Sequence, residues 1–252
     1  MIPKIIHYCW FGRNPLPELA KKCIISWKKY LPDYEIKEWN EDNFNVNIVP
    51  YTAEAYKAKK YAFVSDYARF WILYKYGGLY FDTDVEIIKS INDIIERGAF
   101  IGCELSTSGK KLYSSINPGV GLGASPGLSL YKQVLESYNN RHLYSMDGVI
   151  GETVVQIITK MCKAKEPNVD LSVITTFQGI YCYPWDYFSP IIASTGEMHI
   201  SFNTRSIHHY TATWTKDGKK PRYQRAFLRL KYICIRLYGQ FVWSLFHHIP
   251  QL

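Results

Sequence analysis

Several features that would place the chain in other classes of protein are missing from its sequence. No apolar run is long enough to cross a bilayer, and the apolar N-terminal stretch is too short for a secretory signal because Lys4 and His7 interrupt it. The six cysteines form no Cys-x-x-Cys pair and no cluster with histidine at zinc-site spacing. They are therefore expected to be reduced, buried thiols of a cytoplasmic protein.

Positive charge is in excess, but the pattern of a nucleic-acid-binding protein is absent. The net charge is +8, much of the excess falls in the last third of the chain, and no recognised nucleic-acid motif occurs. We therefore expect no nucleic-acid partner. The 252 residues are 47% hydrophobic and 16% aromatic, which is enough for one large core, and no linker or internal repeat divides them.

The spacing of apolar residues and of helix-ending signals predicts an α/β chain. Strands are expected at 4–10, 34–39, 100–102 and 119–122, and helices at 17–30, 52–60, 65–76, 127–138 and 151–160. A loop-rich region is expected from residue 181 onward. The strand-helix-strand beginning is typical of nucleotide-binding sheets.

Two carboxylates follow an apolar stretch that opens with Gly77-Gly78. In an extended strand, Asp82 and Asp84 would point to the same face, about 7 Å apart. Such a pair suits a hard divalent cation, Mg²⁺ or Mn²⁺, whose remaining positions phosphate oxygens can fill. The plainer interpretation is a strand that ends in an acidic turn.

An acid and a base lie three residues apart upstream of that pair. If Ser65 caps a helix, Asp66 and Arg69 share one face near its N-terminus. There the carboxylate can accept sugar hydroxyls, and the guanidinium can contact phosphate or orient the acid. The alternative is a solvated surface ion pair, which the apolar neighbours Phe63 and Phe70 disfavour.

Together these motifs resemble a known family. Ser-Asp-x-x-Arg at 65–69 followed by Gly-Gly-x-Tyr-x-Asp-x-Asp at 77–84 resembles the sugar-binding region of DXD-containing glycosyltransferases of family 32, which includes initiating α-1,6-mannosyltransferases and capsular polysaccharide enzymes. The opening residues 2–12 and the segments 117–124 and 207–214 are also similar in kind. The resemblance implies one GT-A type domain over residues 1–215, with a central mixed sheet flanked by helices.

The resemblance also implies roles for the four motif residues. Asp84 is expected to ligate a catalytic Mn²⁺ or Mg²⁺ directly, and Asp82 to hold the ribose or complete the metal shell. Asp66 and Arg69 are expected to contact the transferred sugar, with Arg69 also near the diphosphate.

Four further donor-binding candidates follow from the resemblance: Trp10, Asn117, His209 and Trp214. Trp10 would stack on the nucleobase, or alternatively pack in the core. Asn117 would approach the sugar, or serve only as a turn residue. His209, chosen over its neighbour His208, would close over the diphosphate and ligate the metal.

The implied reaction is retaining transfer of a hexose from a nucleotide sugar, with a UDP-hexose such as UDP-galactose favoured. A front-face path is preferred to a carboxylate nucleophile, and Glu104, Asp147 and Glu152 are candidate carboxylates on the acceptor side. The acceptor is expected to be a saccharide, including a lipid-linked oligosaccharide of capsule or lipopolysaccharide synthesis. Two alternatives stay open: a metal-dependent nucleotide-sugar hydrolase or phosphotransferase, and a non-enzymatic carbohydrate-binding module.

The last part of the chain, 216–252, is predicted to be a basic amphipathic helical extension. Cationic and apolar residues alternate over 219–246 so that a helix would have a wide apolar arc. Such a helix suits the anionic inner leaflet of a membrane, which would make the protein peripheral at the cytoplasmic face of the inner membrane. Docking of the same apolar arc on protein is equally compatible with the pattern.

Overall fold

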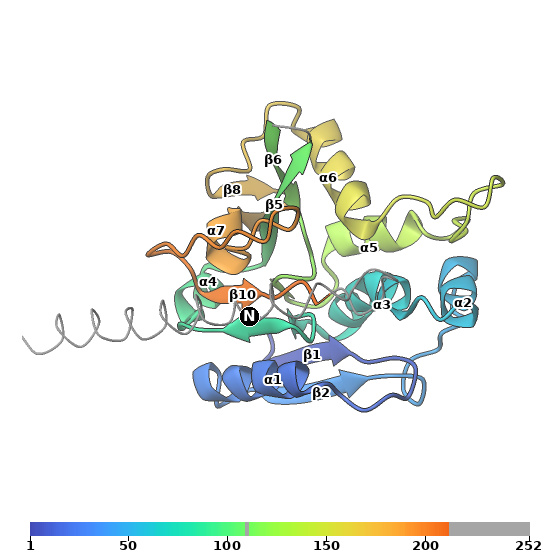
Figure 1. The fold of residues 1–252 in the computed structure, drawn as a ribbon, viewed down its shortest axis with the longest axis horizontal. Helices are drawn as coiled ribbons and strands as arrows, with labels where there is room; N and C mark the ends of the chain where they lie inside the picture. Colours follow the sequence, from blue (N-terminus) through green and yellow to red (C-terminus); the bar gives the residue numbers. More distant parts are fainter. Residues whose placement is uncertain (109–110, 212–252) are drawn as a thin grey trace, which may run out of the picture. The chain divides into compact units, whose positions relative to one another are not determined.

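The computed structural model describes residues 1–108 and 111–211, and residues 1–210 form one compact unit (Figure 1). Residues 212–252 lie outside the described part. The roles expected of Trp214 and of the 219–246 helix, and the domain boundary at 215, therefore stay predictions.

Strands and helices alternate through most of this unit. The strands are β1 (Ile5–Cys9), β2 (Glu35–Trp39), β3 (Gly78–Tyr80), β4 (Val85–Ile87), β5 (Phe100–Ser108), β6 (Lys111–Ile116), β7 (Leu122–Ala124), β8 (Thr175–Phe177), β9 (Ile180–Tyr183) and β10 (Ser206–His208). The helices are α1 (Glu18–Tyr30), α2 (Pro50–Lys57), α3 (Tyr61–Tyr76), α4 (Asn92–Arg97), α5 (Ser129–Glu136), α6 (Val154–Lys165) and α7 (Trp185–Phe188).

A mixed sheet runs through the middle of the unit in the order β2-β1-β3-β7-β5-β9-β8, and β6 pairs with β5 at its side. Strand β1 is parallel to β2 and β3, while β7 is antiparallel to both β3 and β5. Strand β9 is parallel to β5, so the carboxyl ends of β1, β3, β5 and β9 lie at one edge. This is the central mixed sheet flanked by helices that was predicted for a GT-A type domain.

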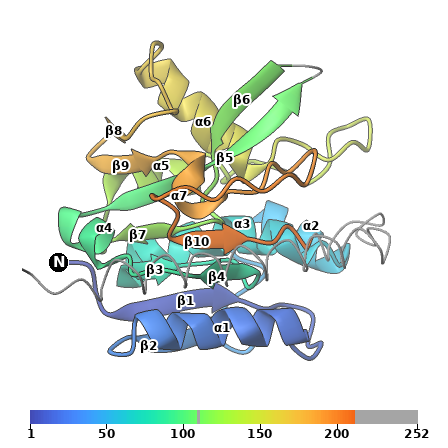
Figure 2. The ribbon, with the colours of Figure 1, turned by 60° about the vertical axis from the view of Figure 1, so that its left-hand side comes forward.

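The sheet separates two hydrophobic cores, because side chains alternate across each strand. On β3, Leu79 belongs to a cluster with Trp27 of α1, whereas Tyr80 belongs to a cluster that contains Phe70 of α3. Figure 2 shows α1 alongside β1 and β2 and the small antiparallel pair of β4 and β10 in front of the main sheet. The indole N–H of Trp27 donates to the carbonyl oxygen of Val85 at 2.7 Å, which fixes that pair against α1.

Two predicted boundaries next to the motif were wrong. Helix α3 begins at Tyr61 instead of at Ser65, because Phe63 and Val64 are buried and extend its apolar face by one turn. Asp66 and Arg69 therefore lie in the helix interior. Strand β3 ends at Tyr80, so the two carboxylates lie on the turn between β3 and β4 and do not alternate along an extended strand.

The early elements agree well with the predicted ones, and the late ones less so. The expected 151–160 helix is shifted to α6, and the expected strand at 119–122 is shifted to β7. The region from 181 was expected to be mostly loop, but it contains β9, α7 and β10. These elements have three or four residues each, which is too short for periodicity to show.

The described cysteines are free and buried, as predicted for reduced thiols: Cys9, Cys23, Cys103, Cys162 and Cys182. Burial raises the pKa of the Cys9 thiol to about 12, although the guanidinium of Arg69 opposes this rise. No helix within residues 1–108 and 111–211 has the length and apolar character of a membrane span.

A buried histidine fixes the start of β1 against its neighbours. The indole N–H of Trp39 donates to Nδ1 of His7 at 3.0 Å, so Nε2 carries the ring proton and donates to the carbonyl oxygen of Gly77, also at 3.0 Å. Burial lowers the pKa of His7 to about 4. A second ring proton would face the Trp39 N–H, which explains why the neutral form is retained.

We expect stability to fall as the pH drops from 7 towards 4. Unfolded His7 binds a proton below its ordinary pKa of 6.5, whereas the folded chain does not until about pH 4, a difference of about 3 kcal/mol. Urea unfolding of the wild type and of His7→Gln, followed at several pH values in this window, measures the effect. The neutral glutamine should remove this part of the pH dependence, and equal slopes in both proteins would contradict it.

Candidate active site

The centre of the site is a buried arginine held between two carboxylates. Arg69 has a side chain that is 5% exposed, and its Nη2 lies 3.0 Å from Oδ1 of Asp66 and 3.2 Å from Oδ1 of Asp82. Its Nε–H donates to the carbonyl oxygen of Ser65 at 3.1 Å, and the guanidinium lies 5.1 Å from the centre of the Tyr80 ring. The structure thus brings three of the four predicted catalytic residues into direct contact.

Burial and charge balance determine the protonation of this cluster. Burial raises the pKa of the Asp66 carboxyl to about 6, although Arg69 opposes the rise. Burial also acts against the guanidinium, but Asp82, Tyr80 and Asp66 together keep the pKa of Arg69 above its usual value. One permanent cation therefore lies between two carboxylates, and Asp82 also accepts from the Tyr80 hydroxyl at 3.1 Å.

The loop after β6 packs tightly on the cluster. The backbone N–H of Asp82 donates to the carbonyl oxygen of Gly119 at 2.9 Å, and the N–H of Gly119 donates to Oδ1 of Asn117 at 2.8 Å. A Cβ at position 119 would collide with Oδ2 of Asp82 and lie 3.0 Å from Nη1 of Arg69. Glycine permits this close approach. The predicted sugar-site residue Asn117 is thereby fixed beside the motif.

The second carboxylate of the motif, Asp84, contacts a histidine instead of Arg69. Asp84 and His208 are largely buried, and Nε2 of His208 lies 3.1 Å from Oδ1 of Asp84. The antiparallel pairing of β4 with β10 places Val85 opposite His208, which brings the ring to the carboxylate. The sequence favoured His209, whose ring lies 3.1 Å from Glu86 and whose backbone N–H donates to the carbonyl oxygen of Asp84 at 3.0 Å.

Asp82, Asp84 and His208 have the donor chemistry of a divalent-cation site. Burial alone would lower the pKa of His208, but Asp84 raises it above its ordinary value. Its Nδ1 atom is buried without a hydrogen-bond partner within the described part of the chain. No group of three or more potential ligands is already gathered there. Two carboxylates and one imidazole fit a cation that takes its other ligands from phosphate and water.

A fourth carboxylate, that of Glu104, connects the two sides of the site. Oε2 of Glu104 accepts from Nδ2 of Asn117 at 2.8 Å and from the hydroxyl of Tyr210 at 2.9 Å. The Tyr210 ring lies 4.1 Å from the ring of His208. Glu104 was predicted only as an acceptor-side carboxylate, and Tyr210 was missed because a lone tyrosine in a tyrosine-rich chain carries no local signal.

The other candidates lie away from these contacts. Trp10 is half-buried, packs against the core on the α1 side and donates its indole N–H to the carbonyl oxygen of Asn14 at 2.6 Å. Glu152 pairs with Arg141 and Lys160, and Asp147 lies in an exposed loop. The expected nucleobase contact of Trp10 stays a prediction.

The fold and these contacts define a class before any comparison is made. A mixed sheet with acidic and cationic groups at the carboxyl edge of its strands is an α/β domain suited to bind a polar, phosphate-bearing or sugar-bearing ligand. Residues 17–101 match the family described as the glycosyltransferase sugar-binding region containing DXD motif. The predicted resemblance to DXD glycosyltransferases is thereby confirmed.

Curated relatives match the chain over a similar length. Inositol phosphoceramide mannosyltransferase 3 of Schizosaccharomyces pombe is 33% identical over 108 residues, which are 40% of this chain and 29% of that protein. The uncharacterized glycosyltransferase L373 of Acanthamoeba polyphaga mimivirus is 35% identical over 106 residues, 40% of this chain and 42% of that protein. The matched part therefore spans less than half the length of these relatives.

Two solved structures are also similar. PaToxG glycosyltransferase has a TM-score of 0.49 and 18% identity, covering 67% of this chain and 72% of its own. A glycosyltransferase involved in glycosylation of the major capsid of PBCV-1 has a TM-score of 0.47 and 13% identity, covering 83% of this chain and 95% of its own.

The contact of Gly119 with Asp82 and Arg69 predicts the effect of one added methyl group. In Gly119→Ala the Asp82 carboxylate must move, and a displacement of about 1 Å in a catalytic group can cost on the order of a hundredfold in rate. We expect donor turnover to fall by that order and the melting temperature to fall as well, because the displaced Asp82 carboxylate also pairs with the buried Arg69. Gly151→Ala is the matched control for glycine loss, because the nearest atom to a Cβ there, the carbonyl oxygen of Leu143, lies 3.9 Å away.

The two adjacent histidines predict unequal effects on cation binding. His208→Gln removes the ring that contacts Asp84, so Mn²⁺ affinity measured by calorimetry in the presence of UDP or GDP should fall about tenfold or more. His209→Gln is the matched control and should retain most of the affinity, since its ring contacts Glu86. The opposite order would identify His209, the histidine favoured by the sequence, as the metal-binding residue.

Proposed function

We propose that the protein is a retaining glycosyltransferase that moves a hexose from a nucleotide sugar to a hydroxyl of a saccharide acceptor. The observation that carries this proposal is the buried contact of Arg69 with both Asp66 and Asp82, next to Asp84 at the carboxyl edge of β3. The family match over residues 17–101 supports it, because this matched region contains all four residues.

The proposed chemistry follows from where charge develops. Breaking the anomeric bond leaves negative charge on a diphosphate, and Arg69, with its fixed guanidinium, can stabilise an oxygen of that group. Asp66 can accept sugar hydroxyls and orient the ring, since Arg69 and the helix hold its carboxylate in place. A divalent cation held by Asp82 and Asp84, with a histidine of β10, would supply further stabilisation of the leaving diphosphate.

The choice of donor extends the proposal. A UDP-hexose, with galactose first, is the donor favoured by the sequence resemblance. Two relatives from Schizosaccharomyces pombe, inositol phosphoceramide mannosyltransferases 1 and 3, support testing GDP-mannose beside it. For the acceptor we propose a saccharide, including a lipid-linked glycan of capsule or lipopolysaccharide assembly. Membrane contact through 219–246 belongs to the same proposal and concerns residues outside the described part.

The first experiment is release of nucleoside diphosphate from a panel of nucleotide sugars, with Mn²⁺, Mg²⁺ or chelator. We expect one donor to be turned over only with metal, and Asp84→Asn to lower this turnover at least a hundredfold, as on the order of 10²- to 10³-fold is typical for loss of an electrostatic catalytic group. Asp42→Asn is the control, because Asp42 is an exposed carboxylate paired with Arg13.

Each alternative gives a distinct result in this assay. Donor cleavage that no saccharide accelerates would indicate a nucleotide-sugar hydrolase or phosphotransferase. Turnover that survives both chelator and Asp84→Asn would overturn the metal mechanism. Saccharide binding without turnover of any donor would indicate a non-enzymatic carbohydrate-binding module.

A further inference from the structure

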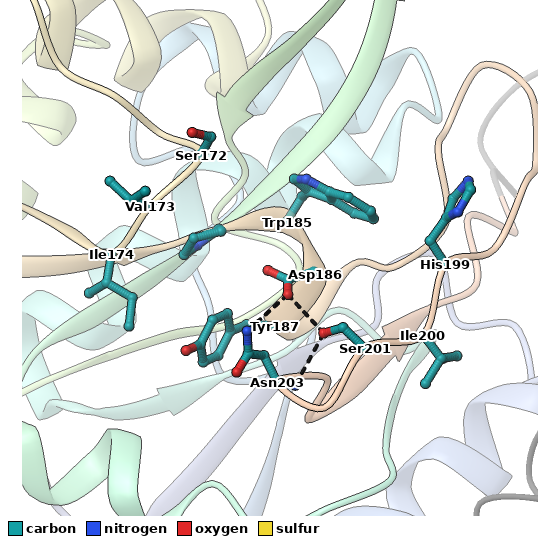
Figure 3. Close-up of a pocket in the computed structure, with 11 residues that line it drawn as sticks. Ser172, Val173, Ile174, Trp185, Asp186, Tyr187, His199, Ile200, Ser201 and Asn203 are labelled. Atoms are coloured by element: carbon teal, nitrogen blue, oxygen red, sulfur yellow. Dashed lines mark hydrogen bonds between the residues drawn. The ribbon is translucent and has the colours of Figure 1, made fainter.

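A second hollow lies apart from the Arg69 cluster and has no role in the reaction described above. It has a volume of about 530 Å³ and is formed by residues 172–174, 184–187, 199–201 and 203 (Figure 3). This volume is within the range of about 300 to 1,000 Å³ that small-molecule sites occupy. The hollow shares no lining residue with the contacts of Asp66, Asp82 and Asp84.

The chemistry of the lining favours one class of ligand. Trp185 and Tyr187 present aromatic rings, which can stack on the C–H faces of a sugar. Asp186, Ser201 and Asn203 present a carboxylate, a hydroxyl and an amide, which can bond to neighbouring hydroxyls. Among the described residues that line the hollow none is a lysine or arginine, and the carboxylate of Asp186 lies among them, so the lining favours a neutral ligand over a phosphate or a nucleotide.

The polar groups are held in place before any ligand arrives. Oδ2 of Asp186 accepts from the hydroxyl of Ser201 at 2.8 Å and from Nδ2 of Asn203 at 3.2 Å, as the dashed lines in Figure 3 show. The rings of Trp185 and His199 meet edge to face at 6.1 Å. A carboxylate fixed beside an aromatic ring reduces the entropy lost on binding a small polar ligand.

The fold places this hollow at the same sheet edge as the Arg69 cluster. Pro184 and Trp185 directly follow β9, which runs parallel to β3 through the pairings with β7 and β5. Three strand spacings separate β3 from β9, or about 14 Å. Asn203 also precedes His208 by five residues, a path of at most about 18 Å. A short oligosaccharide spans such a distance.

We propose that this hollow is a second saccharide-binding site, which holds a neutral sugar unit of the acceptor away from the sugar being transferred. The assignment to the acceptor rests on the proposed glycosyltransferase function. The proposal that the hollow binds a saccharide is independent of that function, because it follows from the lining residues alone.

The test is ¹⁹F NMR of the full chain labelled with 5-fluorotryptophan, with the Trp185 signal assigned from Trp185→Phe. The probes are methyl glycosides of mannose, galactose and glucose, the matching disaccharides, and inorganic phosphate. We expect at least one saccharide to shift the Trp185 signal at millimolar concentration and phosphate to leave it unchanged. No shift with any saccharide, or a shift with phosphate alone, would overturn the proposal.

Two variants connect binding to transfer. Asp186→Asn preserves the size of the side chain and should weaken the Trp185 shift at least tenfold and raise the acceptor KM by a similar factor, with little change in donor hydrolysis. Tyr113→Ala, a half-exposed aromatic on β6, is the matched control and should change neither value.

The outcomes separate this inference from the proposed function. If no donor is turned over but Trp185 responds to sugars, the proposed function fails while the saccharide site stands. If a donor is turned over and Trp185 does not respond, the site fails while the function stands. An unchanged acceptor KM in Asp186→Asn would contradict its assignment to the acceptor.

Discussion

The site depends on one constraint: Arg69 is a permanent cation in the protein interior, and it must be compensated. An unpaired buried charge is strongly destabilising, so Asp66 and Asp82 stabilise the fold around Arg69. Their three-way contact fixes helix α3 against the end of β3. The loop through Gly119 can then pack on the Asp82 carboxylate only because it carries no side chain.

The sequence predicted the parts of this site that depend on local spacing. Asp66 and Arg69 are three residues apart on a helix, and any helix through them puts both on one face. The match of residues 17–101 agrees with the motif that they share with Asp82 and Asp84. The early strands and helices could also be predicted from local spacing, because each is long enough to show its hydrophobic periodicity.

Contacts between distant segments could not be predicted in this way. Glu104 and Tyr210 are 106 residues apart in the chain, and only the course of β5 and β10 brings them together. The difference between His208 and His209 depends on where β10 ends, because His208 is its last residue and pairs with Val85, whereas His209 follows the strand. Asp82 contacts Arg69 and Asp84 contacts His208, and both carboxylates lie between β3 and β4 instead of within a strand.

Cys9 adds a thiol to the side chains that surround Arg69. Its thiol is buried beside Arg69 and Tyr80, and its pKa of about 12 keeps it protonated and unreactive in the closed protein. An alkylating reagent can modify it only when the end of β1 separates from α3 and β3. The rate at which Cys9 is alkylated therefore reports how often the structure opens locally at the Arg69 cluster. Mass spectrometry can measure this rate in the protein without any added mutation.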